Sequence, residues 1–159
     1  MGSIRIVWGT GAGPTAMAAY DDALAAANVH NYNLVAVSSV VPAAASIEAV
    51  GEAPDLGPAG GRLTVVEGRA TVDPGGPEPA VAALGWDREP DGPGLFYEVS
   101  GTDPDAVLDT LETGLAAGRK LREWSFEEGG HKLVVTEPDP ERYVTALVLA
   151  VYGRSEPIV

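Results

Sequence analysis

The segment 143–152 constrains the fold of this chain more than any other stretch. It reads YVTALVLAVY, and an extended conformation would place apolar side chains on both of its faces. Successive side chains of a strand point to opposite sides, so a strand that is apolar throughout must be covered on both sides. We therefore expect this strand in the interior of a layered fold.

Most of the remaining elements are also predicted to be strands. Short apolar or β-branched runs predict strands at residues 4–8, 32–41, 62–72, 94–100, 124–126 and 132–136, and a further strand is possible near 47–50. Residues 80–86 fit a helix or a strand, because their periodicity does not decide between the two.

Two segments predict helices, far apart in the chain. Residues 15–28 carry one apolar helical face made of Met17, Tyr20, Leu24 and Ala27, with Thr15 or Gly13 as the cap. The second helix begins after Asp103-Pro104, and its apolar stripe consists of Val107, Leu108, Leu111 and Leu115. Because strands outnumber helices, we expect one α+β domain over residues 1–159, with packed sheets inside and helices outside.

The charge balance is strongly acidic. Asp and Glu outnumber Lys and Arg by 23 to 10, which gives a formal net charge of −13. Such a chain repels phosphate backbones and anionic lipid, so we expect no nucleic-acid partner and no membrane partner. Acidic surfaces with few lysines suit strong salt, where self-repulsion is screened. The composition thus favours a halophilic cytoplasm, with an ordinary acidic protein as the alternative.

Residue counts exclude several chemistries. The chain has no cysteine, so disulfides, zinc-thiolate sites and thiol nucleophiles are excluded. His30 and His131 stand alone, so no multi-histidine metal site is expected. No apolar run approaches ~18 residues and the first residues lack a signal-peptide core, so we expect a cytoplasmic protein.

A glycine-rich run at residues 9–13, GTGAG, lies between a predicted strand and a predicted helix. Its spacing differs from the dinucleotide-binding fingerprint, and it lacks the lysine of a P-loop. We therefore interpret it as a glycine turn that lets the helix pack closely on a sheet. A Ser-His-Asp hydrolase is also disfavoured, because the chain has no Gly-x-Ser-x-Gly motif.

The segment 33–42, NLVAVSSVVP, gives a more specific signal than the glycine run. It resembles the self-cleavage segment of the pyruvoyl-dependent arginine decarboxylases. Upstream, the glycine run followed by Tyr20 and Asp21 is similar to the first turn and helix of that family. Downstream, residues 94–98, GLFYE, resemble the strand that carries the family's catalytic acid. The ordered motifs together extend the resemblance over nearly the whole chain.

The resemblance implies that the chain cuts itself between Ser38 and Ser39. The hydroxyl of Ser39 would attack the carbonyl of Ser38 to give an ester, and β-elimination and hydrolysis would leave a pyruvoyl group derived from Ser39. The products would be a β chain, residues 1–38, and an α chain, residues 39–159. A decarboxylase needs such a carbonyl because no standard side chain accepts the electrons that the departing CO2 leaves behind.

The resemblance also implies roles for three further residues. Arginine would form a Schiff base with the pyruvoyl group and be converted to agmatine and CO2, a carboxy-lyase reaction of polyamine synthesis. Glu98 would donate a proton to the carbanion, and burial would keep its carboxyl group protonated for that task. Asp21 would bind the guanidinium group, and Asn33 would donate a hydrogen bond during cleavage or substrate binding.

The family's architecture implies a multilayer sandwich of mainly antiparallel sheets flanked by helices (αββα type). It also implies a homo-oligomer, a trimer or a dimer of trimers, with sites between subunits, and the acidic composition suggests a haloarchaeal member. Residues 43–45 are AAA, where family members often carry a second proline and an acidic residue. Two alternatives stay open: a pyruvoyl decarboxylase of another amino acid, and an uncleaved, non-catalytic relative.

Overall fold

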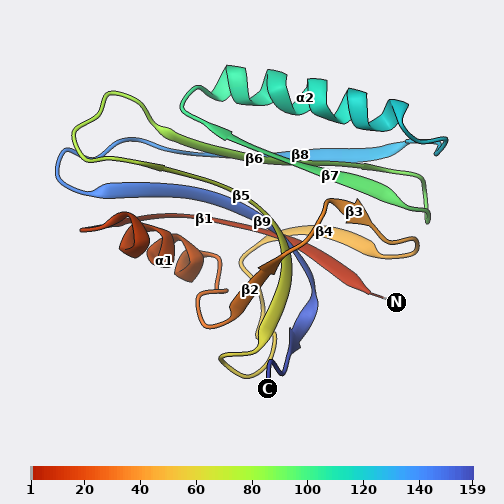
Figure 1. Ribbon diagram of the computed structural model, residues 1–159, viewed down its shortest axis with the longest axis horizontal. Helices are drawn as coiled ribbons and strands as arrows, with labels where there is room; N and C mark the ends of the chain where they lie inside the picture. The colour runs from red at the N-terminus through yellow and green to blue at the C-terminus, as the bar shows by residue number, and fades with distance from the viewer. Residues whose placement is uncertain (1) are drawn as a thin grey trace.

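A computed structural model describes residues 2–159. In chain order its elements are β1 (Ser3–Gly13), α1 (Ala16–Ala26), β2 (Asn33–Ala36), β3 (Val40–Val41), β4 (Ser46–Gly51), β5 (Arg62–Val72), β6 (Ala80–Arg88), β7 (Gly94–Gly101), α2 (Pro104–Lys120), β8 (Glu128–Thr136) and β9 (Tyr143–Glu156). They form four layers, with α1 and α2 on the outer faces of two packed sheets (Figure 1). None of the helices within residues 2–159 has the length and apolar character needed to cross a membrane.

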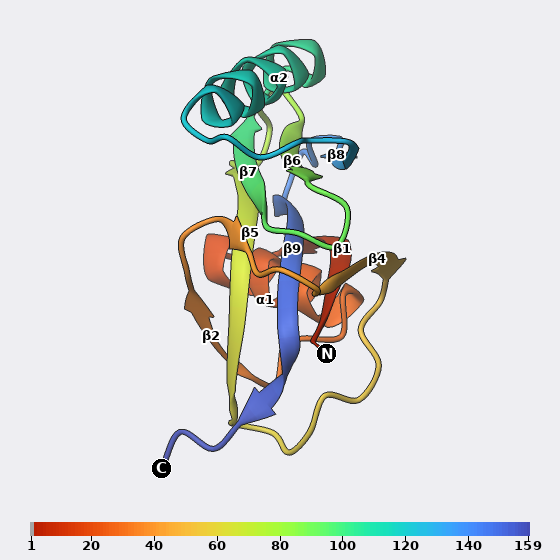
Figure 2. The same cartoon turned by 90° about the vertical axis from the view of Figure 1, so that its right-hand side faces the viewer.

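The two sheets are mainly antiparallel. One has five strands in the order β2-β5-β9-β1-β4, and the other has four in the order β3-β7-β6-β8. Five of the strand pairings are antiparallel, while β1–β4 and β2–β5 are parallel. Figure 2 shows α2 at the top, β6, β7 and β8 beneath it, and β1, β5 and β9 lower down. The expected α+β class and the αββα sandwich are confirmed.

The strand β9 is buried on both faces, as its sequence predicts. It is the middle strand of the five-stranded sheet. One set of its side chains packs between the sheets, namely Val144, Ala146, Val148 and Ala150. The alternate set packs under α1, namely Leu147, Leu149 and Val151. Burying a large apolar side chain contributes roughly 1.5–3 kcal/mol, so β9 holds both halves of the core together.

The helix α1 lies directly against β1, which corrects one expectation. The run 9–13 is not a turn, because β1 continues through it as far as Gly13. Its glycines nevertheless let the helix approach: a Cβ on Gly11 would lie 2.3 Å from the Ala23 nitrogen. The helix begins where predicted, since the Thr15 side chain accepts a hydrogen bond from Ala18 N at 3.0 Å.

Other predicted segments have mixed outcomes. Residues 80–86, left open between helix and strand, lie in β6, and the possible strand near 47–50 is β4. Residues 124–126 are not a strand, and instead the Trp124 and Phe126 rings pack 5.8 Å apart in the connection after α2. The start of α2 is confirmed, because Asp103 caps it. The most consequential correction concerns residues 32–41, which form two strands rather than one.

Candidate active site

The bond between Ser38 and Ser39 lies where the chain passes from one sheet to the other. Before it, β2 pairs with β5, and Val37 N–H donates to the Val65 carbonyl at 3.0 Å. After it, the Ser39 carbonyl accepts a hydrogen bond from Phe96 N–H at 2.9 Å, and β3 pairs with β7. The bond therefore spans the gap between the last contact with one sheet and the first contact with the other.

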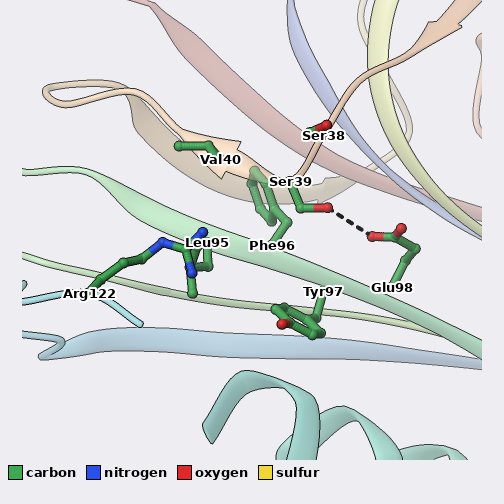
Figure 3. Close-up of a pocket in the computed structure, with 8 residues that line it drawn as sticks. All are labelled: Ser38, Ser39, Val40, Leu95, Phe96, Tyr97, Glu98 and Arg122. Atoms are coloured by element: carbon green, nitrogen blue, oxygen red, sulfur yellow. Dashed lines mark hydrogen bonds between the residues drawn. The ribbon is translucent and has the colours of Figure 1, made fainter. Parts of the chain in front are cut away.

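The hydroxyl of Ser39 points at a carboxylate. Ser39 Oγ donates to Glu98 Oε2 at 3.2 Å, and Figure 3 shows the two side chains facing each other. They border an open cavity of about 360 Å³ whose lining residues are Ser38, Ser39, Val40, Leu95, Phe96, Tyr97, Glu98 and Arg122. The structure thus brings Ser38, Ser39 and Glu98 together around one cavity.

The alternation of β7 explains why Glu98 faces Ser39. Phe96 is buried between the sheets, and Glu98, two residues on, points to the same side at the margin of the core. Tyr97 points the opposite way, toward α2. Its ring packs against Gly114 and Gly118 of that helix, where an added Cβ would collide with the ring. Opposite Glu98 stands Gly68, whose added Cβ would lie 3.3 Å from the Glu98 Cβ, so this glycine leaves room for the carboxylate.

The surroundings of Glu98 differ from the expected ones. Glu98 is exposed in the single chain, whereas burial was expected. The one cation among the residues lining the cavity is Arg122, which donates to the Gly118 carbonyl at 2.9 Å and lies 5.6 Å from the Trp124 ring centre. No group of three potential metal ligands occurs within residues 2–159.

Tyr152 holds the strand that follows the Ser-Ser bond. Its hydroxyl donates to the Val40 carbonyl at 2.8 Å, and its ring meets Phe96 edge-on at 6.1 Å. Burial raises the pKa of Tyr152 to about 12, so the phenol remains a donor at any ordinary pH. Sequence reasoning missed this contact, since Tyr152 only marked the end of an apolar strand.

Two predicted site residues lie away from this cavity. Asp21 is exposed on α1, and neither Asp21 nor Asn33 lines the cavity. The Asn33 side chain donates to the Gly60 carbonyl at 2.8 Å, which ties β2 to the loop before β5. The neighbouring Asp22 accepts from Ala12 N–H at 2.9 Å and so fastens α1 to β1.

Glu98 also lines a second, smaller cavity. It measures about 180 Å³ and lies between β5 and β7, with Glu67 and Arg69 among its lining residues. Tyr20 donates to Glu67 at 2.7 Å, and the Arg69 guanidinium lies 4.2 Å from the Tyr20 ring centre. Burial, followed by the Glu67 carboxylate, raises the pKa of Tyr20 to about 12.

Both sheets leave a strand edge open beside these cavities. In the described part of the chain, β2 covers β5 only over residues 62–65, and β3 covers β7 only over residues 94–95. The segments 66–72 and 96–101 therefore have backbone groups without a strand partner on that side. Val37 and Val40 are also 40% and 44% exposed nearby. Open edges and exposed apolar side chains are features of surfaces that bind another chain.

The comparisons with known proteins agree with the motifs. Residues 3–157 match the family model described as pyruvoyl-dependent arginine decarboxylase. A pyruvoyl-dependent arginine decarboxylase of Halobacterium salinarum is 50% identical to this chain, over 99% of this chain and 98% of the relative. One from Pyrococcus horikoshii is 33% identical, over 87% of this chain and 86% of the relative. One from Pyrococcus furiosus is 32% identical, over 88% of this chain and 89% of the relative.

These matches cover nearly all of the chain and both sides of the Ser-Ser bond. The family is one of enzymes, and its name specifies a pyruvoyl cofactor. The positions that carried the resemblance, Ser39 and Glu98, are the two that meet in the cavity. The chain belongs to the family of pyruvoyl-dependent arginine decarboxylases.

Proposed function

We propose that this chain is the precursor of a self-processing enzyme that converts arginine to agmatine and CO2. It cuts itself between Ser38 and Ser39 into chains of residues 1–38 and 39–159, and the pyruvoyl group is made from Ser39. The observation that carries the proposal is the Ser39–Glu98 hydrogen bond of 3.2 Å, in a cavity at the point where the chain crosses between sheets.

Cleavage requires only atoms that the chain and water supply. Ser39 Oγ bonds to the Ser38 carbonyl carbon, the C–N bond breaks, and the Ser39 nitrogen takes up a proton, which gives an ester. Loss of the Ser39 α-proton and rupture of its Cβ–Oγ bond then release Ser38 as a carboxylate. One water replaces the nitrogen of residue 39, which leaves as ammonia, so no oxidant or reductant is needed.

The residues around position 39 fit a pyruvoyl group. The residue 39 carbonyl is held by Phe96 N–H, and Val40 is held by β7 pairing and by the Tyr152 hydroxyl. None of these contacts involves Ser38, so the cut leaves residue 39 fixed on its sheet. The pyruvoyl group supplies a carbonyl that condenses with the α-amine of the substrate and withdraws electrons as CO2 departs.

Glu98 is the group placed to return a proton to the substrate. It lies within hydrogen-bond reach of the residue 39 side chain, where the reacting carbon would be held. Proton transfer to a carbanion is best protected where bulk water is excluded from the site. A neighbouring subunit that covers the cavity would exclude water, which is one reason to infer an oligomer.

The guanidinium group of arginine is assigned to Asp21 of a neighbouring subunit. Asp21 is exposed and lies outside the cavity of its own chain, so it is free to serve another one. A carboxylate accepts two parallel hydrogen bonds from the planar guanidinium group, which selects arginine over shorter amino acids. The open edges of β5 and β7 next to Glu98 support contact with another subunit there, as the proposed trimer or dimer of trimers requires.

The test combines intact mass spectrometry with an arginine assay, both in strong salt, which suits a chain of net charge −13. Wild type should appear as two chains divided after Ser38, with the larger one carrying a pyruvoyl N-terminus, and should release agmatine. Asp21→Ala should still be cut but lose arginine turnover by about 100-fold or more, whereas Asp109→Ala, an exposed helical aspartate elsewhere, should keep both activities.

The same experiment separates the alternatives. A decarboxylase of another amino acid would be cut and release no agmatine. An uncut relative would keep its full-length mass after prolonged incubation in strong salt, and that result would contradict the proposal.

A further inference from the structure

The carbonyl that must be attacked during cleavage already accepts a hydrogen bond. Val40 N–H donates to the Ser38 carbonyl oxygen at 2.9 Å. The bond joins residues two positions apart and closes a three-residue turn with Ser39 at its centre. The attacking hydroxyl and the attacked carbonyl thus belong to a single closed turn.

The direction of this donor is set by β7. A trans peptide unit is planar, so its C=O and N–H groups point in opposite directions. The unit between residues 39 and 40 has its carbonyl fixed by Phe96 N–H at 2.9 Å, so its N–H must point away from β7, toward the Ser38 oxygen. The next carbonyl, that of Val40, is fixed by the Tyr152 hydroxyl at 2.8 Å. Val40 N–H is therefore held in place from both sides.

We propose that Val40 N–H is the oxyanion-stabilising donor of the self-cleavage reaction. This inference rests on the proposed function, because it concerns the same cut. As Ser39 Oγ bonds to the Ser38 carbonyl carbon, the C=O electron pair moves onto the Ser38 oxygen, and the negative charge develops at the atom that Val40 already contacts. When the C–N bond breaks, the carbonyl re-forms and the charge leaves. A donor fixed before the reaction favours the charged intermediate over the neutral amide.

The side chain expected to assist cleavage is otherwise engaged. Asn33 donates its amide to the Gly60 carbonyl at 2.8 Å. Among the described residues, Val40 N–H is the one group that donates to the Ser38 oxygen. The contribution therefore comes from the main chain, and replacing the Val40 side chain with another apolar one would leave it intact.

The test removes this single N–H. Val40→α-hydroxyisovalerate turns the 39–40 amide into an ester without changing the side chain. The matched control is Val37→α-hydroxyisovalerate, because Val37 N–H also donates to a backbone carbonyl, that of Val65 at 3.0 Å, but not to the Ser38 oxygen. Intact mass spectrometry over time measures cleavage after Ser38 in each chain. We expect cleavage to slow by about 100- to 1,000-fold in the Val40 ester, and by less than about fivefold in the Val37 ester.

A second variant guards against side effects of the ester, whose carbonyl is a weaker acceptor for Phe96. Val40→Pro also removes the N–H but keeps an amide carbonyl on Ser39, and should slow cleavage to a similar extent. A thermal unfolding curve for each variant checks that it is folded. The inference is overturned if both Val40 variants are cleaved as fast as the Val37 ester. It is also overturned if the esters at positions 37 and 40 slow cleavage equally. A wild-type chain that stays uncut overturns the proposed function itself.

Discussion

Replacing Glu98 with glutamine should separate self-cleavage from decarboxylation. Ser39 Oγ donates to Glu98 Oε2 at 3.2 Å in the uncut chain. Glutamine has nearly the same shape and keeps a carbonyl oxygen that can accept this hydrogen bond, but it has no carboxyl proton to give. Glu98→Gln should therefore still orient Ser39 for cleavage, and should fail as the proton donor to the substrate.

The expected magnitudes follow from the type of interaction. A hydrogen bond to a charged group contributes roughly 1.5–3 kcal/mol and one between neutral groups roughly 0.5–1.5 kcal/mol, so the substitution weakens the Ser39 contact by about 1 kcal/mol. Because Glu98 is exposed, water reduces this difference further. Since ~1.4 kcal/mol corresponds to a tenfold change in rate, cleavage should slow by less than about tenfold. Loss of a general acid should slow decarboxylation by about 100- to 10,000-fold.

The assay follows both reactions in one preparation. Intact mass spectrometry gives the time course of cleavage, and CO2 released from carboxyl-labelled arginine gives the rate of decarboxylation by the cut protein. Glu112→Gln, the same substitution at an exposed position on α2, is the control and should change neither rate. If cut Glu98→Gln decarboxylates arginine within tenfold of wild type, Glu98 is not the acid. If the variant stays uncut, cleavage needs the carboxylate itself.

Three further predictions concern the scaffold. Gly11→Ala places a Cβ 2.3 Å from a backbone nitrogen of α1, so denaturant titration should show the free energy of unfolding lowered by about 1–3 kcal/mol. The control is Gly2→Ala, because an added Cβ at Gly2 has no other atom within 4 Å. Equal losses of unfolding free energy in the two variants would contradict close packing of α1 on β1. Asp103→Ala removes the N-cap of α2 and should cost about 1 kcal/mol in the same titration, whereas an unchanged value would mean that the cap is dispensable. Because the pKa values of Tyr20 and Tyr152 are raised from 10.0 to about 12, their stabilising contribution is complete below pH 10 and is lost as the pH rises toward 12. Between pH 10 and 12, the free energy of unfolding should fall less steeply in the double Tyr→Phe variant than in wild type. An equal fall in both proteins would refute that linkage.

The sequence by itself determined the layers of the fold. A strand apolar on both faces must be covered on both faces, and β9 is covered by the second sheet on one face and by α1 on the other. The helix starts at Thr15 and Asp103 were also predictable, because capping depends on side chains within three residues of the backbone groups they satisfy. The Ser-Ser pair was recognisable only through the motifs around it, and those motifs also pointed to Glu98.

The tertiary structure decided what no local pattern encodes. Residues 32–41 predict one strand because the run is rich in valine, yet β2 pairs with β5 in one sheet and β3 with β7 in the other. That division leaves the Ser38–Ser39 bond between the two sheets. Long-range pairing also brings Ser39 to Glu98, 59 residues away, and Tyr152 to Val40, 112 residues away. Periodicity specifies which face of an element is apolar, but the pairing partner of each strand depends on the packing of the whole core, and that packing placed the site.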